Sequence, residues 1–286
     1  MSQVALPQDL DQALAALAAP GARAVAGGTD LMIALARARR EGDELPATLV
    51  ELSRVAELER LEPQGRPPLV GAGVTFRRLA QDPELRRRYP ILSQAAATVG
   101  SVQVRSTATI GGNVANASPA ADGVSALVAL EARAVVAGPA GIRRPLVSEL
   151  ITGPYTTSLE PGELITGFEL DELEPATGQV FAKVGRRRAV AVSRLNLAVV
   201  LDAELADPRL VLGSCFPTPR RLGRAEELLT GGDPGPGLWQ AAGRAAAAAF
   251  AEASGGRASA VYKVPAIKRV AARALADAWQ AVGERS

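Results

Sequence analysis

Two pairs of adjacent glycines constrain this chain more than any other feature of its sequence. Gly27-Gly28 follows an apolar, strand-like run at 22–26 and precedes a segment with helical spacing, and Gly111-Gly112 lies in a second segment rich in small residues. Glycine adopts backbone conformations that other residues avoid, and successive amides in such a turn can point at one anion beside a helix N-terminus. Two such turns predict a ligand with a diphosphate and two nucleoside-like ends. For the first pair the alternative is a tight strand-to-helix turn capped by Thr29.

Neither glycine pair has the pattern G-x-G-x-x-G by which Rossmann folds bind dinucleotides. The nearest string, Gly71-Ala72-Gly73-Val74-Thr75-Phe76, places Phe76 where the third glycine would allow a helix to pack closely. A Rossmann site is therefore disfavoured, and we predict that Gly71 and Gly73 end a strand.

The spacing of apolar residues predicts an α+β chain of about two domains. Residues 9–52 indicate a βαβ-like unit with Gly27-Gly28 in its first turn, and 101–122 are predicted to be a long ordered loop, a place where function often lies. A second α+β unit is predicted from about residue 176. Further helices are predicted from Phe76 to about 88, at 91–99 and in the alanine-rich C-terminal part, and strands at 69–74, 132–136, 164–170, 180–184, 195–202 and 210–215.

The residue types that are missing exclude several chemistries. The chain has no histidine, which removes Ser-His-Asp and Cys-His nucleophiles, the usual zinc sites and a histidyl link to a flavin. Its single cysteine, Cys215, can hold neither an intramolecular disulfide nor an iron–sulfur cluster, which takes about four ligands. We therefore expect no metal site in this chain, so any metal or cluster belongs to a partner.

Composition also bounds the location and the partners. No run of residues has the roughly 18 to 20 uninterrupted apolar positions of a membrane span, and the N-terminus lacks the pattern of a signal peptide. The formal net charge is only +2, a weak signal for nucleic-acid binding. We expect a cytoplasmic protein that neither crosses a membrane nor binds nucleic acid.

Four strings occur in order along nearly the whole chain: AVAGGTDLM from Ala24, TIGGNVANASPAAD from Thr109, GPYTTSLEPGELIT from Gly153 and FAKVGRRRAVAVSRLNLA from Phe181. This arrangement resembles the FAD-binding medium subunits of the molybdenum hydroxylase family, which includes xanthine dehydrogenase and carbon monoxide dehydrogenase. The resemblance implies a two-subdomain PCMH-type FAD-binding domain at 1–175, with subdomains of about 1–57 and 58–175. It also implies a C-terminal domain of antiparallel sheet plus helices at 176–286.

The resemblance further implies which residues contact a non-covalently bound FAD. The first string would hold the pyrophosphate, the start of the second would wrap it from the other side, and either Leu164 or Ile165 would touch the ring system. Val99 stands where some relatives have an aromatic residue. The implied contacts are Ala24, Val25, Ala26, Gly27, Gly28, Thr29, Asp30, Leu31, Val99, Thr109, Ile110, Gly111, Gly112, Asn113, Asp122, Leu164, Ile165 and Lys183.

Four features have implied roles with open alternatives. Asp122 would hydrogen-bond the nucleotide portion of FAD or cap a helix. Lys183 would lie near the flavin and raise its potential, or lie on the surface. Tyr155 would cover one face of the isoalloxazine or be a core aromatic. Arg186-Arg187-Arg188 would meet a nicotinamide dinucleotide or a partner subunit, or form a solvated turn.

The function implied by the resemblance is electron transfer. A large molybdopterin-binding subunit would oxidise an organic substrate, and 2Fe-2S clusters on a small subunit would pass the electrons to this FAD and on to an acceptor such as NAD, a quinone or oxygen. A stand-alone FAD-dependent oxidoreductase of the same superfamily is disfavoured because the chain has no histidine and no added substrate domain. A non-catalytic assembly subunit with a decayed flavin site is disfavoured because the second string is intact.

Overall fold

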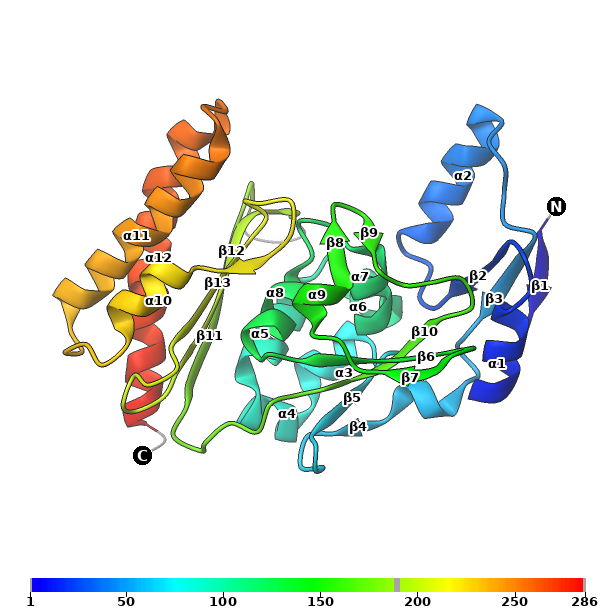
Figure 1. The fold of residues 1–286 in the computed structure, drawn as a ribbon, viewed down its shortest axis with the longest axis horizontal. Helices are drawn as coiled ribbons and strands as arrows, with labels where there is room; N and C mark the ends of the chain where they lie inside the picture. The colour runs from blue at the N-terminus through cyan, green and yellow to red at the C-terminus, as the bar shows by residue number, and fades with distance from the viewer. Residues whose placement is uncertain (1, 188–190, 285–286) are drawn as a thin grey trace.

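A computed structural model describes residues 2–187 and 191–284 of the chain. The N-terminal part is a small parallel sheet of strands β1 (Gln3–Ala5), β2 (Ala22–Val25) and β3 (Thr48–Glu51) in the order β1-β3-β2. Helix α1 (Leu10–Leu17) packs on this sheet, whereas α2 (Leu31–Glu41) has no buried residue and stands out from the body (Figure 1). The predicted βαβ-like unit is present, and β1 is a strand that the sequence pattern did not indicate.

The middle part is an antiparallel sheet in the order β4-β5-β10-β6-β7, with a group of short helices beside it (Figure 1). Its buried side chains, from Val70 in β5 to Phe168 in β10, form one continuous core with those of the helices. The strands are β4 (Leu61–Glu62), β5 (Leu69–Gly71), β6 (Arg133–Gly138), β7 (Gly141–Arg143) and β10 (Leu164–Glu169). The helices are η1 (Ala56–Glu59), α3 (Phe76–Gln81), α4 (Pro83–Arg88), α5 (Pro90–Thr98), α6 (Val102–Thr107), α7 (Ile110–Asn116), α8 (Asp122–Ala129) and α9 (Val147–Leu150), and β8 (Ile151–Gly153) pairs with β9 (Thr156–Thr157).

The C-terminal part is an antiparallel sheet in the order β11-β12-β13-β14. Helix α12 packs on β11 and β12, while α5 and α8 of the middle part also contact this sheet. Strand β12 is therefore buried along almost its whole length, as expected for a strand covered on both faces. The elements are β11 (Gly178–Gly185), β12 (Ser193–Leu201), β13 (Arg209–Gly213), β14 (Arg220–Arg221), α10 (Gly223–Leu229), α11 (Pro236–Ser254) and α12 (Ser259–Gly283).

The segment predicted to be a long loop, 101–122, contains two short helices instead. Ser101 and Thr109 cap α6 and α7, since their hydroxyl groups accept hydrogen bonds from the backbone amides of Val104 and Gly112. The prediction was wrong because the Gly, Asn, Ser, Thr and Val residues of this segment have low intrinsic helix propensity, and N-caps together with packing overrode it. Similarly, the helix predicted from Phe76 to about residue 88 is two helices, because the backbone of Asp82 is extended before Pro83.

The predicted strands at 132–136, 164–170, 180–184, 195–202 and 210–215 are present with small shifts of their ends, and the strand predicted at 69–74 ends at Gly71. Within the described residues, no helix has both the length and the apolar character needed to cross a membrane.

Candidate cofactor site

The two glycine pairs lie together, on the walls of two adjoining cavities between the N-terminal and middle parts. The larger cavity, of about 520 Å³, runs along the start of α2 and reaches Val99, and the smaller one, of about 410 Å³, reaches β5 and β10. Gly27 and Gly112 border both. Of the predicted contacts, the larger cavity is lined by Ala24, Ala26, Gly27, Gly28, Thr29, Asp30, Leu31, Val99, Thr109, Gly112 and Asn113, and the smaller by Ala24, Ala26, Gly27, Thr109, Gly111, Gly112, Leu164 and Ile165.

The first glycine loop presents free backbone donors to the larger cavity. The successive amides of residues 27–31 have no hydrogen-bond partner in the described part of the chain, although all five residues line this cavity. They lie at the N-terminus of α2, where the helix dipole adds positive potential. Such an arrangement binds phosphate groups. The expected cap is absent: Thr29 precedes the N-cap residue, which is Asp30, and neither side chain caps the helix.

The glycines are required for close approach more than for unusual backbone angles. Of the four, only Gly28 has a positive φ, of 66°. A Cβ at Gly27 would overlap the carbonyl oxygen of Thr107, which directly precedes the second loop. A Cβ at Gly111 would lie 2.6 Å from that of Ala72 in the turn after β5. Gly27 thus brings the two loops together, and Gly111 seats α7 on the sheet.

The second loop differs from the first because its backbone amides already donate hydrogen bonds within the protein. Ile110 and Gly111 donate to the carbonyl oxygens of Val74 and Ala72 at 3.1 and 2.9 Å, and the amides of Gly112 and Asn113 donate to Thr109. The residues of this loop that line the larger cavity include Gly112, which has no side chain, and Asn113, which has an amide side chain. The buried Oδ1 of Asn113 has no hydrogen-bond partner among the described residues. Ile110 itself is fully buried and lines neither cavity.

Asp122 and Lys183 contact each other instead of these cavities. The Asp122 carboxylate accepts hydrogen bonds from Lys183 Nζ at 2.5 Å, Ser193 Oγ at 2.6 Å and Asn196 Nδ2 at 2.9 Å. Two alternatives from the sequence were wrong, the helix cap for Asp122 and the surface position for Lys183. Asp122 is buried in the first turn of α8 and caps nothing, and the Lys183 side chain is only 12% exposed. The pair joins α8 to the C-terminal sheet, and the contact of either residue with FAD stays a prediction.

Lys183 also borders a separate hollow of about 940 Å³ between the α5–α6 turn and the end of β11. Arg186 and Arg187 line this hollow, and Arg188 lies outside the described residues. Arg186 and Arg187 therefore line the same hollow as Lys183.

Tyr155 lies in the turn between β8 and β9 and outside both cavities. Tyr155 is 69% exposed, which overturns the alternative of a core aromatic. Its φ is 58°, an unfavourable backbone region for a residue with a Cβ, and its amide donates to the carbonyl oxygen of Ala117, which also has a positive φ. The predicted contact of Tyr155 with the flavin face is not tested by this arrangement.

Several residues of the site were missed by the sequence prediction. The segment 159–163 lines the larger cavity, and Glu163 borders both. Arg143 donates two hydrogen bonds of 2.7 Å to the two oxygens of Glu163 and thereby lowers the pKa of this carboxyl group. A carboxylate that would otherwise repel a diphosphate is thus neutralised. The segment lies within the third string, but the Arg143 partner could not be read from sequence spacing.

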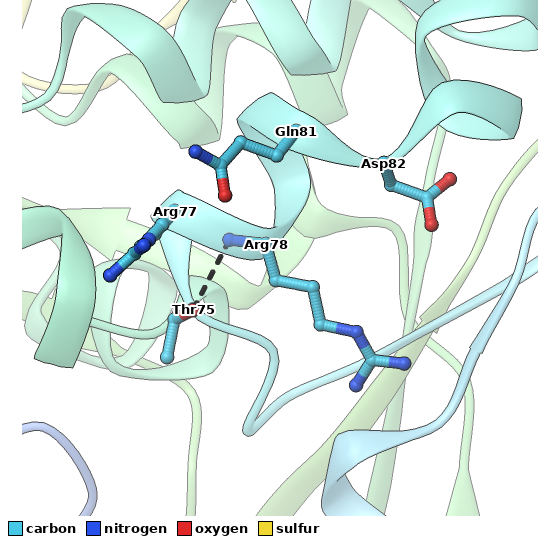
Figure 2. Close-up of a pocket in the computed structure, with 5 residues that line it drawn as sticks. All are labelled: Thr75, Arg77, Arg78, Gln81 and Asp82. Carbon is cyan, nitrogen blue, oxygen red and sulfur yellow. Dashed lines mark hydrogen bonds between the residues drawn. The ribbon is translucent and has the colours of Figure 1, made fainter.

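A further hollow, of about 340 Å³, lies on the surface of α3 and is lined by Thr75, Arg77, Arg78, Gln81 and Asp82 (Figure 2). Its groups serve local structure: Thr75 Oγ1 accepts from the amide of Arg78, the bond drawn in Figure 2, and Arg78 Nη1 donates to the carbonyl oxygen of Glu59. None of the predicted cofactor contacts lines it.

The main cavities fit the implied FAD. Free amides at a helix N-terminus suit a diphosphate, and the unpartnered Asn113 Oδ1 suits a hydroxyl donor. Buried Leu164 and Ile165 give the smaller cavity an apolar wall for a flat ring system.

Comparison with known proteins agrees with this geometry. Residues 1–170 match the family model of the FAD-binding domain in molybdopterin dehydrogenase, and residues 180–278 match the C-terminal domain of the CO dehydrogenase flavoprotein. The chain is 31% identical over 214 residues to the FAD-subunit of nicotinate dehydrogenase of Eubacterium barkeri, an alignment that covers 72% of this chain and 71% of that one. It is 29% identical over 280 residues to the carbon monoxide dehydrogenase medium chain of Hydrogenophaga pseudoflava, covering 96% and 95%.

Solved structures extend the comparison to the whole fold. A chain of quinoline 2-oxidoreductase from Pseudomonas putida 86 superposes with a TM-score of 0.86 at 27% identity, covering 99% of this chain and 98% of that one. The predicted fold class, an α+β FAD-binding domain followed by a C-terminal domain of antiparallel sheet and helices, is confirmed. The chain belongs to the molybdopterin dehydrogenase family, as its FAD-binding flavoprotein subunit.

Proposed function

We propose that this chain binds FAD across the two adjoining cavities and transfers electrons within a complex that also contains a large molybdopterin-binding subunit and a small 2Fe-2S subunit. The support for such a complex is that related proteins are named as subunits, among them the carbon monoxide dehydrogenase medium chain and the nicotine 6-hydroxylase medium subunit. The electron acceptor, in this proposal, is a small molecule such as NAD, a quinone or oxygen. FAD, when bound, supplies the capacity to take up and release electrons.

The protein's own residues would bind and orient this cofactor. The amides of residues 27–31 would donate to the diphosphate, and the α2 dipole would stabilise its charge. Asn113 Oδ1 would accept a hydrogen bond from a hydroxyl group of the cofactor. Leu164 and Ile165 would exclude water from one face of the ring system. The observation that carries the proposal is the run of free amides on the wall of a cavity.

A charge placed in this run tests the proposal. The variant Thr29→Glu adds a carboxylate among the amides, so we expect FAD binding to weaken at least about a hundredfold, since like charges in a confined site cost several kcal/mol. Its matched control is Ala36→Glu, which adds the same charge to an exposed position on the same helix. The measurements are the FAD released by acid precipitation, identified from its absorption spectrum, and the dissociation constant of the reconstituted chain.

The outcomes separate the interpretations. If Thr29→Glu and Ala36→Glu bind FAD equally well, the diphosphate does not lie at α2. If the unmodified chain takes up no FAD, the non-catalytic assembly subunit replaces the proposed function.

A further inference from the structure

The turn that follows α5 carries part of the wall of the larger cavity. Val99 and Val104 line this cavity, and Gly100 lies between them with a φ of 46°. A Cβ at Gly100 would lie 2.8 Å from the side chain of Val104, so the turn packs tightly onto the start of α6. The position of the apolar wall therefore depends on what holds the backbone of residues 98–100.

Two cations hold this backbone through its carbonyl groups. Arg105 Nη1 donates to the carbonyl oxygens of Val99 and Gly100 at 2.9 and 3.0 Å, and Lys183 Nζ donates to that of Thr98 at 3.0 Å. Carbonyl groups at the end of a helix lack partners within the helix, and charged donors bond to them more strongly than neutral ones. Neither Arg105 nor Lys183 lines either of the two main cavities.

Lys183 comes from the C-terminal domain, whose described residues contribute nothing to the lining of the two main cavities. Every residue that lines the two main cavities, within the described chain, is numbered 165 or lower. The Lys183 ammonium group is oriented by Asp122, which Ser193 and Asn196 of β12 hold in turn. The network therefore connects the C-terminal sheet to the cavity wall through one carbonyl group.

We propose that Arg105 and Lys183 are positioning residues of the FAD site, which fix the wall formed by Val99 and Val104 by holding the carbonyl groups of residues 98–100. The inference rests on the proposed binding of FAD in this cavity. A consequence is that the C-terminal domain sets the affinity for FAD although it does not line the cavities.

The first test is the dissociation constant for FAD of Arg105→Met in the full-length chain. We expect binding at least about tenfold weaker, while the thermal midpoint of the FAD-free chain changes by no more than a few degrees. Arg105→Lys should restore most of the affinity, because an ammonium group can also donate to two carbonyl groups. The matched control is Arg86→Met, which removes an arginine bonded to a single carbonyl group, that of Ala80, outside both cavities.

A double-mutant cycle separates positioning from general stability. If Arg105 acts through Val99, the loss caused by Arg105→Met should shrink in a Val99→Ala background, because the wall it positions is already truncated. Independent effects of the two substitutions would overturn the proposal. A lower thermal midpoint of Arg105→Met with an unchanged dissociation constant would also overturn it, since that is the result of a structural role alone.

Lys183 is tested as part of its buried pair. Lys183→Met by itself would leave Asp122 buried without its cation, so Asp122→Asn/Lys183→Met is compared with Asp122→Asn. We expect the double variant to bind FAD more weakly than the single one, and we expect this difference to shrink in a Val99→Ala background, because the bond to Thr98 acts through the wall at Val99 and not through direct contact with FAD. Equal affinities would remove Lys183 from the proposal. If the unmodified chain binds no FAD, the proposed function fails first; if it binds FAD and the variants match it, only this inference fails.

Discussion

At the scale of single residues, the glycines of the two strings are required for different physical reasons. Gly28 allows a positive φ, whereas Gly27 and Gly111 are needed because a side chain would meet Thr107 and Ala72. Gly111→Val is therefore not a clean test of cofactor binding, since the larger side chain would separate α7 from the turn after β5. Gly27 is half-buried and borders both cavities, so a Cβ there would act on the contact between the two loops at the site, and not on the packing of a buried helix.

We predict that Gly27→Ala weakens FAD binding at least about tenfold, because the added methyl group moves the first loop away from the second. Gly42→Ala is the matched control. Gly42 follows the last residue of α2, the helix after the first loop; its φ is 79°, and no atom lies within 4 Å of the position that a Cβ would take. That control should lose about 1 kcal/mol of folding stability from backbone strain and no FAD affinity. Flavin fluorescence titration and thermal unfolding measure both quantities; equal affinities of the two variants would contradict the prediction.

At the scale of secondary-structure elements, short capped helices build the second loop. Helix α7 has a sequence of low helix propensity, and it forms because Thr109 caps it and because the carbonyl groups of Ala72 and Val74 accept its first amides. The cavity surface at Gly112 therefore depends on a local cap and on β5 together.

We predict that Thr109→Val lowers the free energy of unfolding by about 1 kcal/mol, the usual value of an N-cap. This corresponds to a fall of about 2–4 °C in the thermal midpoint for a domain of this size. Thr107→Val is the comparison, because its hydroxyl group bonds only to carbonyl groups within α6 and caps no helix. Calorimetry of the FAD-free variants makes the measurement, and equal midpoints would show that the cap contributes nothing.

At the scale of the whole molecule, an ionic cluster joins the middle part to the C-terminal domain. Arg209, whose side chain is 8% exposed, contacts Asp171 at 2.7 Å and Asp207 at 2.6 Å, and Arg221 contacts Glu131 and Asp207. Burial tends to raise the pKa of Asp207, but its hydrogen bonds with Arg209 and its further contact with Arg221 outweigh this and lower the pKa below its usual value. The cluster acts in addition to the Asp122 and Lys183 pair.

The lowered pKa of Asp207 predicts how stability depends on pH. A carboxyl group with a depressed pKa in the folded chain contributes stability that is complete above the unfolded value, about 3.9, and is lost as the pH falls through the folded value. In Asp207→Asn, the loss of unfolding free energy between pH 7 and pH 3 should be smaller than in the unmodified chain. Asp277→Asn removes the same charge from an exposed pair on α12 and serves as control. Urea titrations at both pH values test this; identical losses in the unmodified chain and Asp207→Asn would contradict it.

Much of the fold followed from local patterns in the sequence. The strands β6, β10, β11, β12 and β13 and the helices α1, α2 and α5 were predictable, since apolar periodicity and turn residues act over short distances, whereas β7, β8 and β9 were missed. Strand β1 was not, because three residues, two of them exposed, carry no distinct period. Helices α6 and α7 were missed although Ser101 and Thr109 are good N-caps, because the small residues after them suggested a loop.

The sequence by itself determined where the two glycine pairs lie along the chain and that histidine chemistry is absent, because each depends on residue type and local order. Only the tertiary structure decided which loop keeps its backbone amides free of hydrogen bonds. It also decided the pairing of three cations with distant acceptors: Lys183 with Asp122, Arg143 with Glu163, and Arg105 with the carbonyl oxygen of Val99. These contacts join groups whose pairing depends on how the chain packs. A donor and an acceptor distant in sequence carry no mutual signal until folding brings them within hydrogen-bond distance.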